Sequence, residues 1–371
     1  MIIKSYSVYT TEKSAFEQMC QSLLMQIGRK SNVIKIVYFG IPQNNEEYLH
    51  QFHQLRSYTK AYFPDRPPLI SYVAQKPFIG MLNAEVVFVE EIEKVHVSPG
   101  ENYVVLENGI CRELVTGGIL PPDISASVSD QSNAVFSRIE QILTCENFPV
   151  NSILRQWNYI EGINVFRDSH QHYQDFNDSR SQFYAKTNWP SGYPAATGIG
   201  TQFGGVMVEI FAFTGEGLVN RALDNPLQVA AHKYSQDVLL GTTEQRTTPK
   251  FERARVIGTS EKQIVFISGT AAIRGELSLH VDDVIEQVRV IMDNIDCLIS
   301  SANYLSEAAM QEYKLLRIYI KNPDQIETVH NYMDAHYPDV KKLYVCADVC
   351  RDELLLELEG IAEIKGINPL I

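Results

Sequence analysis

The chain has 371 residues, which predicts two or three structural units rather than one ordinary domain. Hydrophobic residues make up 45% and charged residues 21%, a globular balance without any stretch near the roughly 20 apolar residues of a membrane-spanning helix. The formal net charge of −13 and the scattered basic residues argue against nucleic acid as a partner. Six irregularly spaced cysteines without a CxxC pair, and an N-terminus unlike a signal peptide, predict free thiols and a cytoplasmic location.

Residues 1–95 are expected to form the first and smallest unit. Apolar periodicity predicts a helix over 12–28, a strand over 32–40, a second helix over 45–62 and a strand over 82–91. The short segment IKSYSVYT precedes the first helix, where the later units have a hairpin. The first unit is therefore a reduced version of the two that follow.

Residues 96–213 repeat this order of elements at full length. A strand pattern, a helix, a strand, a second helix and closing strands are expected in turn. These segments are 102–118, 133–148, 154–163, 172–184 and 197–213.

Residues 253–371 show the same order most clearly. Strand-like residues 263–275 turn at Gly269, and residues 281–302 form a helix with one apolar face. A strand over 315–321, a helix capped by Asn322 and ending at His336, and two β-rich segments complete the unit. Strand and helix patterns that recur in this way predict an α+β fold of tandem lobes, with mixed sheets each packed against two helices.

The segment 214–252 is predicted to be an insert that links the second and third units. Residues 225–240 within it are expected to form a helix, and residues 242–251 a loop. Loops of this length inside a compact enzyme are more often functional than idle.

The closing strands of the three units align Glu85, Glu209 and Glu357. Duplication of a stable α+β unit without any shared site would produce the same repeats. The alignment therefore predicts related folds, and by itself no common chemistry.

The third unit resembles the YjgF/RidA family, once described as the endoribonuclease L-PSP superfamily. The resemblance rests on SGTA at 268–271, on apolar and amide positions over 284–294, and on LLELEGIA at 355–362. RidA proteins are small imine hydrolases that form trimers with their sites in the clefts between subunits. The resemblance implies chorismate-mutase-like lobes arranged around a pseudo-threefold axis.

Three such units in one chain resemble the chorismatases over most of residues 90–371. The motifs that carry this resemblance, in order, are YQDFNDSR at 173–180, YPAATGIG at 193–200, PKFERA at 249–254, SGTAAI at 268–273 and ADVCRDELLLELEG at 347–360. The resemblance implies an enzyme that releases pyruvate from chorismate and supplies a hydroxybenzoate or a dihydroxy-dihydrobenzoate to secondary metabolism. It implies no metal or organic cofactor, no membrane or nucleic-acid partner, and a monomer that acts as a pseudo-trimer, or a homotrimer. The active cleft is expected between the second and third lobes.

Glu357 matches the catalytic glutamate of the chorismatases. Chorismate carries an enol ether, whose terminal methylene must be protonated before the C–O bond breaks. That step requires a carboxylic acid with a raised pKa in a poorly hydrated cleft. Alternation along the strand puts Glu359 on the same side as Glu357. A water-facing or arginine-paired carboxylate is the alternative for either residue, and Glu359 is a candidate for a purely structural role.

Cys350 and Ala271 match positions that influence the product. By resemblance, a cysteine at position 350 goes with an aromatic 3-hydroxybenzoate, whereas Ala271 follows the pattern of diol-forming enzymes. An ordinary buried cysteine is the alternative for Cys350. The sequence therefore leaves the product open.

The two carboxylates of chorismate are suited to arginine forks, which bind carboxylates in a bidentate manner. We expect two of four candidate arginines to contact the ligand, with Arg180 the strongest candidate. Two tyrosines could add hydroxyl donors. The candidates are Arg180, Arg155, Arg253, Arg274, Tyr173 and Tyr193.

Two other functions compete with this interpretation. A RidA-type enamine or imine deaminase would require a carboxylate-binding arginine near position 342, where this chain has Lys342. A non-catalytic protein that binds small molecules would leave its cleft without a desolvated glutamate.

Overall fold

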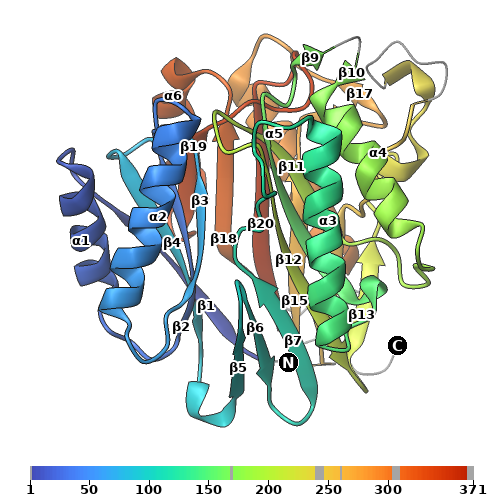
Figure 1. Ribbon diagram of the computed structural model, residues 1–371. Coiled ribbons are helices and arrows are strands. Elements are labelled where there is room, and N and C mark those ends of the chain that lie inside the picture. Colours follow the sequence, from blue (N-terminus) through green and yellow to red (C-terminus); the bar gives the residue numbers. More distant parts are fainter. Residues whose placement is uncertain (1, 168–169, 239–245, 260, 303–309, 366–371) are drawn as a thin grey trace.

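The computed structural model describes residues 2–167, 170–238, 246–259, 261–302 and 310–365. They form an α+β structure with three main sheets of four, six and six strands, and two small two-stranded sheets. Helices cover the outer faces of the main sheets, as Figure 1 shows. No helix in this part of the chain is long and apolar enough to cross a membrane.

The first sheet has the order β1-β4-β2-β3, with β2 and β3 parallel and the other pairs antiparallel. Asn44 begins the second helix because its side chain accepts a hydrogen bond from the Glu47 N–H. The apolar faces of both helices pack on this sheet. The elements are β1 (Lys4–Thr10), α1 (Phe16–Ile27), β2 (Val33–Gly40), α2 (Asn45–Tyr62), β3 (Leu69–Val73) and β4 (Leu82–Val89).

The second sheet has the order β11-β8-β12-β7-β6-β5, with β11 and β8 parallel. Ser127 caps its first helix by accepting from the Asp130 N–H. The elements are β5 (His96–Gly100), β6 (Tyr103–Glu107), β7 (Cys111–Thr116), α3 (Val128–Cys145), β8 (Ile153–Glu161), β9 (Phe166–Arg167), β10 (His170–Gln171), α4 (His172–Tyr184), β11 (Ala195–Thr201) and β12 (Val206–Gly215).

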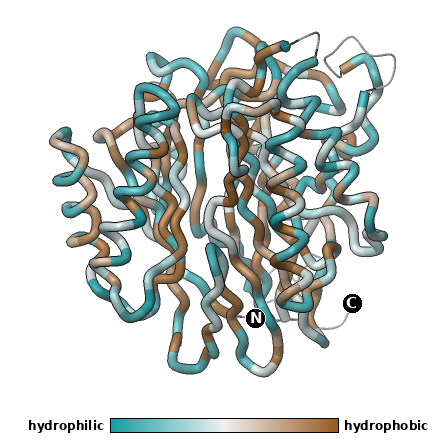
Figure 2. The backbone as a smooth tube through the Cα atoms, viewed as in Figure 1, coloured by the Kyte–Doolittle hydropathy of each residue, from teal (hydrophilic) through white to brown (hydrophobic). Residues whose placement is uncertain are grey.

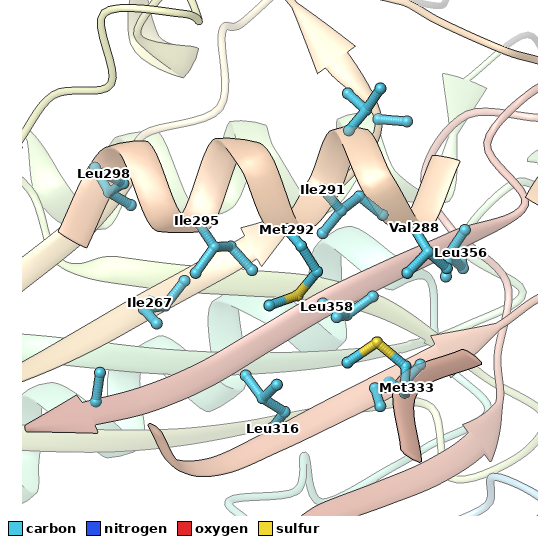
Figure 3. Close-up of a cluster of buried hydrophobic side chains, with 14 of the residues drawn as sticks. Ile267, Val288, Ile291, Met292, Ile295, Leu298, Leu316, Met333, Leu356 and Leu358 are labelled. Atoms are coloured by element: carbon cyan, nitrogen blue, oxygen red, sulfur yellow. The ribbon is translucent and has the colours of Figure 1, made fainter. Parts of the chain in front are cut away.

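The third sheet has the order β13-β14-β15-β20-β18-β19, with β18 and β19 parallel. The predicted stripe on α5 lies against this sheet, where Val288, Ile291 and Ile295 meet Leu316 and Leu358 (Figure 3). The elements are β13 (Val219–Leu223), β14 (Ala254–Gly258), β15 (Lys262–Thr270), β16 (Ile273–Arg274), β17 (Leu277–Ser278), α5 (Val284–Ala302), β18 (Met310–Ile320), α6 (Ile326–His336), β19 (Lys342–Cys346) and β20 (Leu356–Lys365).

The segment 214–252 differs from the prediction in two ways. It is more than a linker, since β13 adds a strand to the edge of the third sheet. The helix expected over 225–240 is wrong for the described residues 225–238, which form only short 3₁₀ turns at Ala231–Lys233 and Gln236–Val238. The backbone of this segment forms hydrogen bonds with other segments of the protein instead of with its own preceding turn, as in the bond from Val229 N–H to Gly275 O. Residues 239 and 240 lie outside the described residues.

The three main sheets share the same middle arrangement. In each, one strand (β4, β12 or β20) pairs antiparallel with the first strand of a parallel edge pair. The inner faces of the three sheets contribute to common apolar clusters, to which no α-helix contributes a residue in the part of the chain that the structure describes. Figure 2 shows apolar residues concentrated along these central strands, and polar residues along the outer sides of the helices. Alternation along each strand therefore separates a helix-facing side from a side that faces the other sheets.

Buried ion pairs join the inner faces of the sheets in a cycle. Each pair links a cation on the first strand of a parallel pair to a carboxylate on the middle strand of another sheet. All six side chains are buried. The pairs are Lys35 with Glu209 at 3.0 Å, Arg155 with Glu359, and Arg317 with Glu85 at 2.5 Å.

Arg317 also reaches Glu359, at 3.0 Å, so that its loss would leave two buried carboxylates with fewer partners. We expect Arg317→Met to lower the free energy of unfolding by about 3–5 kcal/mol in urea denaturation, because an uncompensated buried charge is strongly destabilising. Arg289→Met is the control, since Arg289 lies half-exposed and pairs with Glu286 within one helix. A loss no larger than that of the control would contradict a structural role for the cycle.

Candidate active site

A cavity lies between the second and third sheets. Its walls come from α4, β11, the strand end at β15, the loop before β20, and residues from 234–238 and 249–253. Backbone contacts fix the two sheets here: Ala196 N–H donates to Ser268 Oγ at 3.0 Å, and Gly269 N–H donates to Thr197 Oγ1 at 3.0 Å. The cavity is thus built by both sheets.

Glu357 lies on the cavity wall at the start of β20 and is only 6% exposed. Its carboxylate sits directly over Gly269, where an added Cβ would lie 1.9 Å from Glu357 Oε1. Glycine at position 269 is therefore required for this close approach. Within the described part of the chain, no hydrogen bond to the Glu357 carboxyl is found.

The environment favours the neutral form of Glu357. Burial, together with the negative charge of Glu359, raises the pKa of Glu357 to about 8, although Arg155 and Arg253 act to lower it. Near pH 7 this side chain is a carboxylic acid with a proton to donate.

Glu359 has the opposite character, although it lies only two residues away on the same side of β20. Burial alone would raise the pKa of Glu359, but Arg155 and Arg317 together with hydrogen bonds from Thr197 and Tyr319 hold it below the ordinary value. Glu359 is therefore an ionised structural carboxylate, and the pKa values of the two glutamates are pushed apart.

Two buried arginines face the cavity without a carboxylate partner among the described residues. Arg180, on α4, donates to Asn177 Oδ1 at 2.5 Å, and its Nε has no hydrogen-bond partner. Arg253 donates to Val229 O at 2.6 Å and to the Tyr234 hydroxyl at 2.7 Å, and its Nε is likewise free. Uncompensated buried cations favour an anionic ligand. Two of them on one cavity are suited to a dicarboxylate.

Three further predicted residues also line the cavity: Tyr173, Cys350 and Ala271. The Tyr173 ring packs against Gly198, where an added Cβ would lie 2.9 Å from it. Burial raises the pKa of the Cys350 thiol to about 12, and the neighbouring Glu357 adds to this shift. Cys350 is thus a neutral, unreactive thiol that shapes the wall.

The structure does not place Arg155, Arg274 or Tyr193 on this cavity. Arg155 is taken up by Glu359, behind Glu357. Arg274 points to α5, where it bonds Asn294 Oδ1 at 2.6 Å. The ring of Tyr193 stacks with Tyr184, with ring centroids 5.8 Å apart. These three residues lie away from the other candidates, and their role as ligand-binding residues stays a prediction.

Sequence reasoning missed Gln174, Asn177, Tyr234 and Arg351, which also line the cavity. Asn177 could have been found, because Tyr173, Asn177 and Arg180 are spaced to share one helical face. Tyr234 and Arg351 lie in irregular segments, where no periodicity points to a direction.

Lys342, which stands where a deaminase would need its arginine, lies outside the cavity. Its Nζ pairs with Asp334 at 2.8 Å and donates to Tyr337 O at 2.6 Å. The structure therefore offers no cation from β19 to a ligand beside Glu357.

The raised pKa of Glu357 has a consequence for stability. The folded protein binds a proton more tightly than the unfolded chain, so the contribution of Glu357 is fully present below pH 4.5 and is lost as the pH rises through about 8. We expect Glu357→Gln to become more stable relative to wild type across this window, by on the order of a few kcal/mol at pH 9. Urea denaturation at a series of pH values measures the difference. Exposed Glu327→Gln is the control; a Glu357→Gln curve parallel to wild type would contradict the assignment.

Comparison with known proteins identifies relatives of this chain. The family description "Chorismatase FkbO/Hyg5-like, N-terminal" matches residues 112–212. A 3-hydroxybenzoate synthase from Streptomyces hygroscopicus is 29% identical over 258 residues, which cover 66% of this chain and 72% of the relative. A chorismatase from Streptomyces rapamycinicus is 30% identical over 238 residues, 62% of this chain and 68% of the relative.

A solved structure supports the fold. The crystal structure of a chorismatase at 1.08 Å resolution superposes with a TM-score of 0.68 and covers 97% of this chain and 98% of its own, at 20% sequence identity. The likeness extends over nearly the whole chain. The chain belongs to the chorismatase family.

Proposed function

We propose that this protein releases pyruvate from chorismate and yields a hydroxybenzoate or a dihydroxy-dihydrobenzoate. The observation that carries the proposal is the buried Glu357, with its pKa raised to about 8, on a cavity that also contains two arginines without a carboxylate partner among the described residues. Relatives named chorismatase and 3-hydroxybenzoate synthase support this substrate.

Glu357 is the general acid in the proposed reaction. Its proton passes to the terminal methylene carbon of the enol ether, which becomes a methyl group, and the positive charge develops on the adjacent ether carbon. Addition of water there gives a hemiketal that breaks down to pyruvate and the ring diol, with one water consumed. The route to an aromatic hydroxybenzoate consumes no net water. In this route an internal hydroxyl of the substrate takes part, and the ring loses the elements of water as it becomes aromatic. In both courses, a carboxyl with a pKa near the working pH is suited to the first step.

Arg180 and Arg253 hold the two carboxylates of the substrate in this proposal. Each has unused donor capacity on the cavity, and a guanidinium fork matches a carboxylate geometrically. Tyr173 lines the same wall and supplies a hydroxyl or a ring face. Cys350 and Ala271 are proposed to influence whether the diol or the aromatic product leaves, since both limit the space beside Glu357.

We also propose that the three sheets represent RidA-like lobes around a pseudo-threefold axis, at 1–95, 96–213 and 253–371, with 214–252 as the insert. The shared strand order and the cyclic ion pairs support this arrangement. A single chain would then act as a pseudo-trimer, with a homotrimer as the alternative assembly. The six free cysteines are consistent with a cytoplasmic location.

Replacing the proposed acid tests the function directly. We expect Glu357→Gln to lower the rate of pyruvate release from chorismate by about 100-fold or more, because general acid catalysis contributes on that scale. Coupled lactate dehydrogenase measures the pyruvate, and chromatography identifies the ring product. Glu327→Gln, on the exposed surface of α6, is the control. Equal rates for wild type and Glu357→Gln would exclude Glu357 as the acid.

The arginines are tested by lysine replacements that keep the charge. Arg180→Lys and Arg253→Lys should each raise KM for chorismate by about tenfold or more, since a charge-assisted hydrogen bond contributes about 1.5–3 kcal/mol. Arg274→Lys is the matched control, because Arg274 belongs to the same set of candidate arginines but bonds to α5. The assignment is wrong if Arg274→Lys raises KM as much as the two cavity variants do.

A further inference from the structure

The three middle strands place a glutamate at equivalent positions, and only one of the three is left without a cation. The strand pairing shows the equivalence: Glu85 lies opposite Val37, Glu209 opposite Trp157, and Glu357 opposite Tyr319. Each of these three opposing residues comes two places after a basic residue on its own strand. Those basic residues are Lys35, Arg155 and Arg317. Glu85 and Glu209 pair with a cation from another sheet, whereas Glu357 does not.

Glu209 has two contacts that the equivalent Glu357 lacks. Lys35 pairs with Glu209, and the Ser71 hydroxyl donates to the same carboxylate. Arg155 and Thr197 occupy the corresponding places in the second sheet, since Ser71 lies opposite Val37 and Thr197 opposite Trp157. A strict repeat would bring Arg155 and Thr197 to Glu357.

Instead, Arg155 and Thr197 both bond to Glu359. The residue two places after the aligned glutamate is Val87 in the first sheet and Phe211 in the second, so only the third sheet has a second carboxylate there. Trp157 Nε1, at 3.1 Å, and the Tyr319 hydroxyl, at 2.8 Å, also donate to Glu359. Its oxygens are thus fully engaged.

We propose that Glu359 is a positioning residue: by engaging Arg155 and Thr197 it withholds both from Glu357, which remains the uncharged carboxyl of the cavity. The activity readout of this inference rests on the proposed function, whereas its spectroscopic readout does not. Glu359 contacts no part of the cavity itself and acts only through its neighbours.

Several titratable or charged groups face Glu357 from the elements around it. Of these, Glu359 bears the negative charge that opposes ionisation of Glu357, whereas Arg155 and Arg253 favour its ionisation. The groups are Glu359 on β20, Arg155 on β8, Arg253 before β14, Tyr173 and Arg180 on α4, Tyr319 on β18, and Cys350 and Arg351 in the loop before β20.

The test is Glu359→Gln, followed by infrared spectroscopy of the protonated carboxyl of Glu357 at pH 7 without substrate. The band assigned to Glu357 is the one that Glu357→Gln removes. We expect Glu359→Gln to reduce it by half or more, because Arg155 then loses its carboxylate partner and a nearby cation lowers a carboxyl pKa by about 1–3 units. If the band persists undiminished in Glu359→Gln, the inference is overturned, whatever happens to activity.

The pH profile gives the second readout. In wild type, kcat/KM for chorismate should fall as the pH rises through about 8. In Glu359→Gln the fall should begin about one unit lower or more, so that activity drops about threefold or more at pH 7.5 and much less at pH 5.5. A uniform loss at every pH would indicate a merely structural role and contradict the inference.

A double variant distinguishes the positioning role of Glu359 from a general effect of its replacement on folding. Glu359→Gln with Arg155→Met removes the released cation together with its partner, and should restore both the infrared band and the wild-type pH limit. Glu359→Asp should retain both without a second change. A double variant whose band stays reduced would contradict the role given to Arg155. If the band behaves as expected while wild type releases no pyruvate, the positioning role stands and the proposed function fails.

Discussion

The cyclic set of buried ion pairs is the constraint on which the rest of this structure depends. A buried charge without a partner is strongly unfavourable, so each cation must find a carboxylate on another sheet. Lys35, Arg155 and Arg317 do so in turn, which fixes the three sheets relative to one another. The cavity between the second and third sheets keeps its shape because its walls belong to elements held in this way.

The chemistry of the site comes from a small departure within this repeat. Glu209 and Glu357 occupy equivalent strand positions, yet one is clamped by Lys35 and the other lies unbonded over Gly269. The difference arises because Glu359 satisfies the cation that would otherwise reach Glu357. A carboxyl that is buried and deprived of its cation keeps its proton, and a structural position thereby becomes an acid.

Much of this fold was predictable, because it follows from periodicity. The helix over 172–184 has the bounds that its pattern predicted, and the alignment of Glu85, Glu209 and Glu357 agrees with the pairing register. Partners far apart in the chain were not predictable. The sequence made Arg155 a candidate ligand-binding residue, and only the three-dimensional arrangement shows Glu359, 204 residues away, as its partner. The segment 225–238 has helical composition, but its backbone bonds are made elsewhere.

The neutral state of Glu357 also explains why the two cavity arginines remain available. An ionised Glu357 would be an anion within the field of Arg253, and the cavity would satisfy its own charge. With Glu357 protonated, Arg180 and Arg253 keep their charge for a ligand. A protein of net charge −13 repels a dianion at long range. The affinity for a dianion must therefore come from such desolvated local contacts. Proton donation and anion binding therefore depend on the same condition, which Glu359 maintains from outside the cavity.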